Sequence, residues 1–325
     1  MARAFAPGKC ILFGEHAVVY GYPAVAVAID AGVEVSISES SEWTIEGTEF
    51  EPSRHPHITH IIRDVFGYNG TPLDIDIKSG LFSAAGLGSS AAISNAMGAA
   101  LQFHLKPDEV LDRIGLARMG HSAEAIAQKG RASPTDTATS ALGGCVVVSG
   151  DLVDGTEHVF DATLETPEGE RSWSISKTTI PEDLDAWIVL GFTGVGSPTG
   201  KMVAGVANLL ESDPSKESDM EAIGNITNAG LAALSAGNLE AVGIAMSACH
   251  ERLKSLQVSS PELEHLIAAV GPHSLGAKMT GAGGGGCMVA LTRDPRRVAE
   301  AIEIAGGKPL ISRLGAEGAR IIRKT

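Results

Sequence analysis

The stretch 82–96, FSAAGLGSSAAISNA, places two glycines and two serines directly before an alanine-rich run. Just upstream, LDIDIKS (73–79) alternates apolar and polar residues and predicts a strand. Downstream, SSAAISNAMGAALQFHL (89–105) predicts a helix. A glycine-rich turn that opens a helix can bind an anion, because free backbone N–H groups and the helix dipole favour negative charge there.

This turn does not fit two common nucleotide motifs. A P-loop needs a lysine before its Ser or Thr, and this stretch has none. Residues 86–91 match a relaxed dinucleotide fingerprint, but the acids at 108–109 open a predicted helix instead of ending a second strand. Residues 281–286 match the strict fingerprint and yet precede a strand. A phosphate-binding loop is therefore favoured, and a tight turn with an ordinary serine cap is the alternative.

Outward from this turn, the patterns alternate between strands and helices and predict an α+β fold. Residues 2–30 indicate strand, loop and strand, with Lys9, Glu15 and His16 in or beside the loop. Two further amphipathic strands are expected at 33–40 and 42–47.

Helices are expected over 57–66 and from Pro107 onward. A second unit starts near residue 182, with long helices to about residue 270 and a glycine run entering a strand at 277–292.

Composition narrows the class of protein. The 325 residues carry a formal net charge of −14, which disfavours nucleic acid or anionic membranes as partners. The longest apolar runs are too short to cross a bilayer, and the first residues lack the features of a signal peptide, so a cytoplasmic location is expected.

The cysteines and histidines give little sign of a metal or disulfide site. The four cysteines form no C-x-x-C pair and are interpreted as buried free thiols. The histidines in SRHPHITHIIRDVF (53–66) are interpreted as a loop entering a surface helix, with a metal site as the lesser alternative.

Three separated stretches carry a family resemblance. APGKCILFGEHAVVYG (6–21), GLFSAAGLGSSAA (80–92) and KMTGAGGGGC (278–287) stand in the order found in the GHMP kinases. The segment GEHAVVYG is most similar to the mevalonate kinases among them, and ASPTDTATSALGG (132–144) resembles their short archaeal members.

The resemblance implies a two-domain α+β fold with the active site in the cleft between the domains. Residues 1–180 would form an ATP-binding domain like the second domain of ribosomal protein S5. Residues 181–325 would form a ferredoxin-like domain. A homodimer is a further expectation from the family.

The resemblance also assigns the nucleotide site. Backbone N–H groups of the loop would bind the ATP phosphates, and Ser90 and Glu124 would bind Mg²⁺, with Ser89 as the substitute for Ser90. A surface helix carboxylate is the alternative for Glu124. The expected ATP-binding residues are Ala84, Ala85, Gly86, Leu87, Gly88, Ser89 and Ser90.

The implied reaction transfers the γ-phosphoryl group of ATP to the 5-hydroxyl of mevalonate. Asp136 would accept the alcohol proton, and Lys9 would keep that carboxylate ionised and offset transition-state charge. A turn or helix-cap role for Asp136 and a solvated loop position for Lys9 are the alternatives. The expected substrate-site residues are Lys9, Glu15, His16, Asp136, Thr199, Gly281, Ala282 and Gly283.

Other functions stay open at this point. They are phosphorylation of phosphomevalonate, 3-phosphorylation of mevalonate, ATP-dependent decarboxylation, and ligand sensing without turnover. Lys9 and Asp136 are both present, which argues against a sensor. The partners expected are therefore mevalonate and ATP, with no nucleic acid and no membrane.

Overall fold

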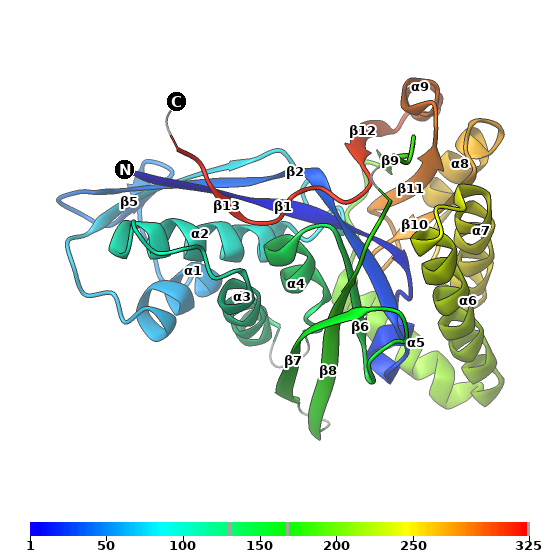
Figure 1. Ribbon diagram of the computed structural model, residues 1–325, viewed down its shortest axis with the longest axis horizontal. Coiled ribbons are helices and arrows are strands. Elements are labelled where there is room, and N and C mark those ends of the chain that lie inside the picture. The colour runs from blue at the N-terminus through cyan, green and yellow to red at the C-terminus, as the bar shows by residue number, and fades with distance from the viewer. Residues whose placement is uncertain (129–131, 167–168, 182, 324–325) are drawn as a thin grey trace.

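The computed structural model describes residues 1–128, 132–166, 169–181 and 183–323 (Figure 1). Its strands are β1 (Ala2–Phe13), β2 (Ala24–Glu39), β3 (Thr44–Ile45), β4 (Thr48–Glu49), β5 (Leu73–Ser79), β6 (Cys145–Ser149), β7 (Glu157–Thr166), β8 (Gly169–Thr178), β9 (Trp187–Phe192), β10 (Gly276–Thr280), β11 (Cys287–Thr292), β12 (Lys308–Arg313) and β13 (Arg320–Ile321). Its α-helices are α1 (Pro56–His60), α2 (Ser89–Leu105), α3 (Arg113–Ala127), α4 (Thr135–Leu142), α5 (Thr199–Ser212), α6 (Glu217–Ser235), α7 (Leu239–Ser255), α8 (Pro261–Val270) and α9 (Pro295–Ile304).

The first sheet runs β4-β3-β5-β2-β6-β8-β7, with β1 also paired to β2 and β13 paired to β1. Helices α2 and α4 pack against β1 and β2, and α3 packs on α2 and α4. The small side chains of α2 allow a close approach. Figure 1 shows these helices beneath the long β1 and β2 strands. The glycine turn before α2 is thereby held against β1.

An irregularity in β1 places Lys9 inside the fold. The pairing of β1 with β2 shifts between Pro7 and Lys9, which is the mark of a bulge. Beside the bulge, the Lys9 amide donates to Leu87 O at 3.0 Å. A Cβ on Gly8 would lie 2.9 Å from the same oxygen, so the two segments meet backbone against backbone.

The second sheet has the order β10-β11-β9-β12 and is antiparallel throughout. Numbered within this half of the chain, the order is 2-3-1-4, which is that of a ferredoxin-like βαββαβ unit. Helices α7 and α8 pack on β10 and β11, and α9 packs on β12. The α+β fold and the ferredoxin-like second half are therefore confirmed.

The chain does not divide cleanly into two halves. After β12 it returns to the first sheet, where Ile321 pairs with Ala4 and the main chain of Gly143 bridges to Glu317. Figure 1 shows this return as the red segment along β1, so both described ends lie on the same side of the molecule. The division at residues 180 and 181 stays a prediction.

Several elements match the sequence patterns, and three differ. Strand 73–79, helix 89–105 and the helical segment expected over 57–66 are confirmed, the last as α1 followed by a π-helical turn at Ile61–Val65. Lys9 lies within β1 rather than in a loop, because the strand continues through the bulge. The expected strand at 33–40 is the second part of the 16-residue β2.

The third difference concerns the helix expected from Pro107. Helix α3 begins only at Arg113, because Asp112 caps it by accepting a hydrogen bond from Gly115 N.

The four cysteines are buried and free, as their sequence context predicts. Burial raises the pKa of the Cys10 thiol to about 11, which keeps it protonated at neutral pH. Among the helices of the described residues, none combines the length and the apolar character needed to span a membrane.

Gly243 in α7 tests how closely this helix must approach β10. A Cβ at Gly243 would lie 2.2 Å from Leu275 O, so we expect Gly243→Ala to lower the free energy of unfolding by roughly 1–3 kcal/mol. Gly205→Ala in α5 is the control, because a Cβ there meets open space and should stabilise by up to about 1 kcal/mol. Urea unfolding of both variants measures the difference. Equal effects would show that backbone approach does not limit this contact.

Candidate active site

Lys9 and Asp136 form an ion pair between β1 and the first turn of α4. Lys9 Nζ lies 3.0 Å from Asp136 Oδ1 and donates to Gly86 O at 3.0 Å. The Lys9 side chain is 4% exposed and that of Asp136 is 38% exposed. The carboxylate is therefore open to solvent at the end of a buried cation, which excludes the solvated-loop alternative for Lys9.

The turn before α2 exposes backbone donors beside this pair. Gly86 and Gly88 have φ of 77° and 71°, and Gly88 is the N-cap of α2 without any side-chain hydrogen bond to the first turn. The first-turn N–H groups of an α-helix have no partner within the helix. The serine-cap alternative is thus absent, and an anion has donors available here.

A second glycine loop from the other domain closes on the first. Residues 281–286 include five glycines with positive φ, namely Gly281, Gly283, Gly284, Gly285 and Gly286. Ser197 joins the two loops, since its amide donates to Ala84 O at 2.8 Å and its hydroxyl donates to Gly283 O at 2.7 Å. Three loops, around residues 84–88, 193–198 and 281–286, therefore meet beside Lys9.

Ser90 and Glu124 are brought together with a residue that the sequence did not single out for this site. His57 Nε2 lies 2.8 Å from Ser90 Oγ and 3.3 Å from Glu124 Oε1. Burial favours the neutral acid, but the neighbouring His57 ring and Ser90 hydroxyl outweigh it and lower the pKa of Glu124. Glu124 is 6% exposed, which excludes the surface-carboxylate alternative.

The donor set of these two residues fits a hard divalent cation. Gln128 Nε2 donates to Glu124 Oε2 at 2.5 Å, whereas Oε1 is buried without a well-formed hydrogen bond among the described residues. One ionised carboxylate and one hydroxyl are ligands that Mg²⁺ accepts, and it takes its other ligands from water and phosphate. Within the described residues, no three His, Cys, Asp or Glu side chains gather into a metal cluster.

Glu15 and His16 face the second domain. Burial lowers the pKa of His16, so the ring is neutral at pH 7 and its Nε2–H donates to Ala282 O at 2.9 Å. Glu15 forms a buried ion pair with Lys278 of β10. Neither side chain is open to solvent in this conformation, with Glu15 at 2% and His16 at 7% exposure. Their direct contact with substrate stays a prediction.

Thr199 stands at the start of the helix that follows the 193–198 loop. It is the first residue of α5 and is exposed, and its amide donates to Ser197 O at 3.0 Å. Its nearest link to the phosphate loop passes through Ser197, which the sequence pattern did not indicate. The role of Thr199 near phosphate stays a prediction.

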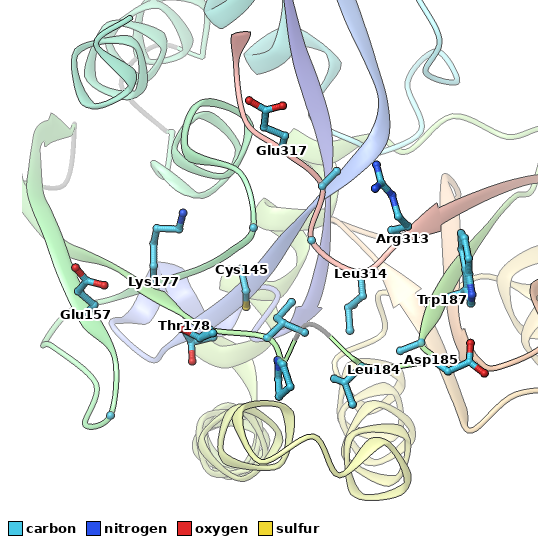
Figure 2. Close-up of a pocket in the computed structure, with 18 residues that line it drawn as sticks. Cys145, Glu157, Lys177, Thr178, Leu184, Asp185, Trp187, Arg313, Leu314 and Glu317 are labelled. Atoms are coloured by element: carbon cyan, nitrogen blue, oxygen red, sulfur yellow. The ribbon is translucent and has the colours of Figure 1, made fainter. Parts of the chain in front are cut away.

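A further cavity lies elsewhere in the molecule. It has a volume of about 930 Å³ and is bordered by β8, the 179–187 connection and the returning segment 313–317. Figure 2 shows Lys177 and Arg313 on its walls together with Glu157, Asp185 and Glu317. It contains none of the predicted site residues, and its mixed charges favour neither anion nor cation.

Comparisons with known proteins show the family to which the chain belongs. Residues 57–144 match the family model "GHMP kinases N terminal domain", and residues 231–309 match "GHMP kinases C terminal". The mevalonate kinase of Pyrococcus furiosus is 32% identical over 98% of this chain and 97% of its own length. That of Methanothermobacter thermautotrophicus is 35% identical over 89% of each chain.

Solved structures of mevalonate kinases share the fold of this chain. The Methanococcus jannaschii mevalonate kinase structure has a TM-score of 0.76 and 25% identity, covering 97% of this chain and 98% of that one. An L. major mevalonate kinase in complex with R-mevalonate shares the fold, with a TM-score of 0.74 and 22% identity over 94% of this chain and 91% of that one. The chain belongs to the GHMP kinase family. Within that family, its full-length relatives named above are mevalonate kinases.

Gly88 tests whether the loop must stay bare beside the ion pair. A Cβ at Gly88 would lie 3.1 Å from Lys9 Cγ and 3.5 Å from Asp136 Oδ2, on a backbone with φ of 71°. We expect Gly88→Ala to lower nucleotide affinity and turnover by at least about tenfold, because both the loop and the pair must move.

Gly47→Ala is the matched control for Gly88→Ala. Gly47 has φ of 73°, and its Cβ would meet nothing within 4 Å, so it isolates backbone strain. Calorimetric titration with ATP and a thermal melt are run on both variants. Unchanged ATP affinity in folded Gly88→Ala would contradict a phosphate-binding role for this loop.

Proposed function

We propose that this protein transfers the γ-phosphoryl group of ATP to the 5-hydroxyl of mevalonate, giving 5-phosphomevalonate and ADP. The observation that carries the proposal is the Lys9–Asp136 pair beside an uncapped helix N-terminus and two glycine loops. Relatives named mevalonate kinase align over nearly the whole chain, which supports mevalonate as the acceptor.

Asp136 is positioned to serve as the general base. Its carboxylate is partly open to solvent and lies 3.0 Å from the Lys9 ammonium. In the proposed reaction, the mevalonate hydroxyl gives its proton to Asp136 as its oxygen attacks the γ-phosphorus. Such transfers depend on positioning and charge more than on covalent catalysis by the protein.

Lys9 has two tasks in this proposal. Its ammonium is held by Gly86 O and Asp136, so it cannot turn away from the cleft. A fixed positive charge there offsets the negative charge that develops on the transferring phosphoryl group. Because Gly86 O of the phosphate loop anchors Lys9, a change in the conformation of that loop would also move the positive charge of Lys9.

The phosphates of ATP would bind the backbone amides at the start of α2. Residues 84–90 supply this turn, and residues 281–286 face it from the second domain. Ser90 and Glu124 would hold Mg²⁺, which would neutralise charge on the phosphate oxygens. His57 borders both ligand atoms and would be their neighbour in the loaded enzyme.

Mevalonate would lie on the Asp136 side of this cleft. His16, which donates to Ala282 O, and the main chain at 281–283 are the proposed orienting groups, together with Thr199. Glu15 acts, in this proposal, through the segment it anchors. A homodimer and a cytoplasmic location are further predictions of the family resemblance.

A panel of acceptors separates this function from its alternatives. Mg·ATP is incubated with mevalonate, phosphomevalonate or mevalonate diphosphate, and ADP, the phosphorylated product and CO₂ are measured separately. The product from mevalonate is analysed by NMR to distinguish the 5-phosphate from the 3-phosphate. ADP and 5-phosphomevalonate formed together, without CO₂, are the expected result. Nucleotide binding without ADP formation from any acceptor would favour a sensor.

Asp136→Asn tests the general base. The amide keeps the size of the side chain but cannot accept the proton, so we expect kcat to fall by ~10²-fold or more with ATP affinity little changed. Asp154→Asn, at an exposed position, controls for loss of one charge. Steady-state kinetics and ATP calorimetry are the measurements. A kcat within about threefold of wild type would remove Asp136 from this role.

Glu124→Gln tests the metal site. The amide loses the charge that Mg²⁺ prefers, so the Mg²⁺ concentration for half-maximal activity should rise at least about tenfold with KM for mevalonate little changed. Binding of Mg²⁺·ATP by calorimetry should weaken in parallel. Glu221→Gln on exposed α6 is the charge control. Lower thermal stability with unchanged Mg²⁺ dependence would show that Glu124 is only structural.

A further inference from the structure

Lys278 and Glu15 form an ion pair that is sealed from solvent between the two domains. Their side chains are 0% and 1% exposed, and Lys278 Nζ donates to both Glu15 Oε1 and Met279 O. Burial raises the pKa of Glu15, and the Lys278 ammonium opposes that shift. Fully buried lysines are rare unless they are paired, so this position requires its partner.

The pair belongs to a set of contacts along one face of β10. Successive side chains of a strand alternate between faces, so Lys278 and Thr280 point the same way. Thr280 Oγ1 accepts from Ile11 N at 3.0 Å and donates to Ile11 O at 3.2 Å. Both side chains therefore bind the end of β1 and the segment that follows it.

Each partner is followed directly by residues of the candidate active site. Lys278 is three residues before Gly281, whose Cβ would lie 3.3 Å from Gly86 O of the phosphate loop. Glu15 is followed by His16, which has a strained φ of 62° and donates to Ala282 O. The ion pair thus lies behind the point where the two sides of the cleft meet.

We propose that Lys278 is a positioning residue for phosphoryl transfer. Its bond to Glu15 fixes the separation between the Lys9–Asp136 side of the cleft and the glycine loop 281–286. The inference rests on the proposed function, because that function makes this separation matter for turnover. Lys278 itself contacts neither of the candidate catalytic side chains and acts through the loops that follow the pair.

Three variants separate positioning from stability. Lys278→Met leaves the Glu15 carboxylate buried without its cation and should strongly destabilise the fold. Glu15→Gln leaves the Lys278 ammonium buried without its carboxylate partner. The double variant, Glu15→Gln with Lys278→Met, carries no buried charge and should recover most of the lost melting temperature. Lys308→Met, at an exposed position of β12 in the same sheet, is the control for loss of a surface lysine.

The double variant carries the decisive measurements. They are the thermal melt, the affinity for a magnesium complex of a non-hydrolysable ATP analogue, and kcat with mevalonate at saturation. We expect the melt to recover while nucleotide affinity and kcat both stay at least about tenfold below wild type, since the cleft is folded but no longer held at its spacing. Lys308→Met should match wild type in all three.

Other outcomes overturn the inference. Recovery of the melt together with wild-type affinity and kcat would make the pair purely structural. A double variant as unstable as Lys278→Met would contradict the charge-compensation argument. If wild-type protein binds the ATP analogue but does not phosphorylate mevalonate, the proposed function fails. The nucleotide affinity of the double variant then still decides whether Lys278 positions the loops.

Discussion

A buried ammonium group must be surrounded by acceptors, and at Lys9 this requirement organises the whole cleft. The bulge in β1 directs the side chain inward, where Gly86 O and Asp136 are its partners. Because Lys9 contacts Gly86 O and Asp136 at the same time, it holds the turn before α2 close to the first turn of α4. The partly open carboxylate, the turn before α2 and the bulge of β1 all meet at this one desolvated charge.

Much of the fold could be predicted from the sequence, because it depends on local patterns. Strand 73–79 alternates in polarity and helix 89–105 has no proline and a single glycine, so both have the predicted bounds. The patterns failed where residues far apart in the sequence determine the bounds of a helix or strand. Pro107 and its acids resemble a helix start, but Asp112 caps a helix that begins at Arg113, six residues after Pro107. The length of β2 depends on three partner strands that no local window contains.

In the candidate site too, some residues could be predicted from sequence motifs and others could be found only from the structure. Lys9, Asp136, Ser90 and Glu124 carry strong motifs, and the structure brings them together as two neighbouring pairs of groups. His57 and Ser197 were missed because their role depends on spatial neighbours that are 33 and 86 residues away in sequence. Lys278 stood within a quoted motif, but only burial reveals that it faces Glu15.

The returning C-terminal segment has a consequence for how the chain is made. Ile321 pairs with Ala4, so the first sheet receives β13 only after the second domain has been synthesised. Domains usually fold as they are synthesised, from the N-terminus onward. Here the edge of β1 that β13 covers stays open until the entire second domain has emerged. Nascent chains of this protein therefore have an unpaired strand edge while the second domain is being synthesised, which is when pairing with a neighbouring copy competes with folding.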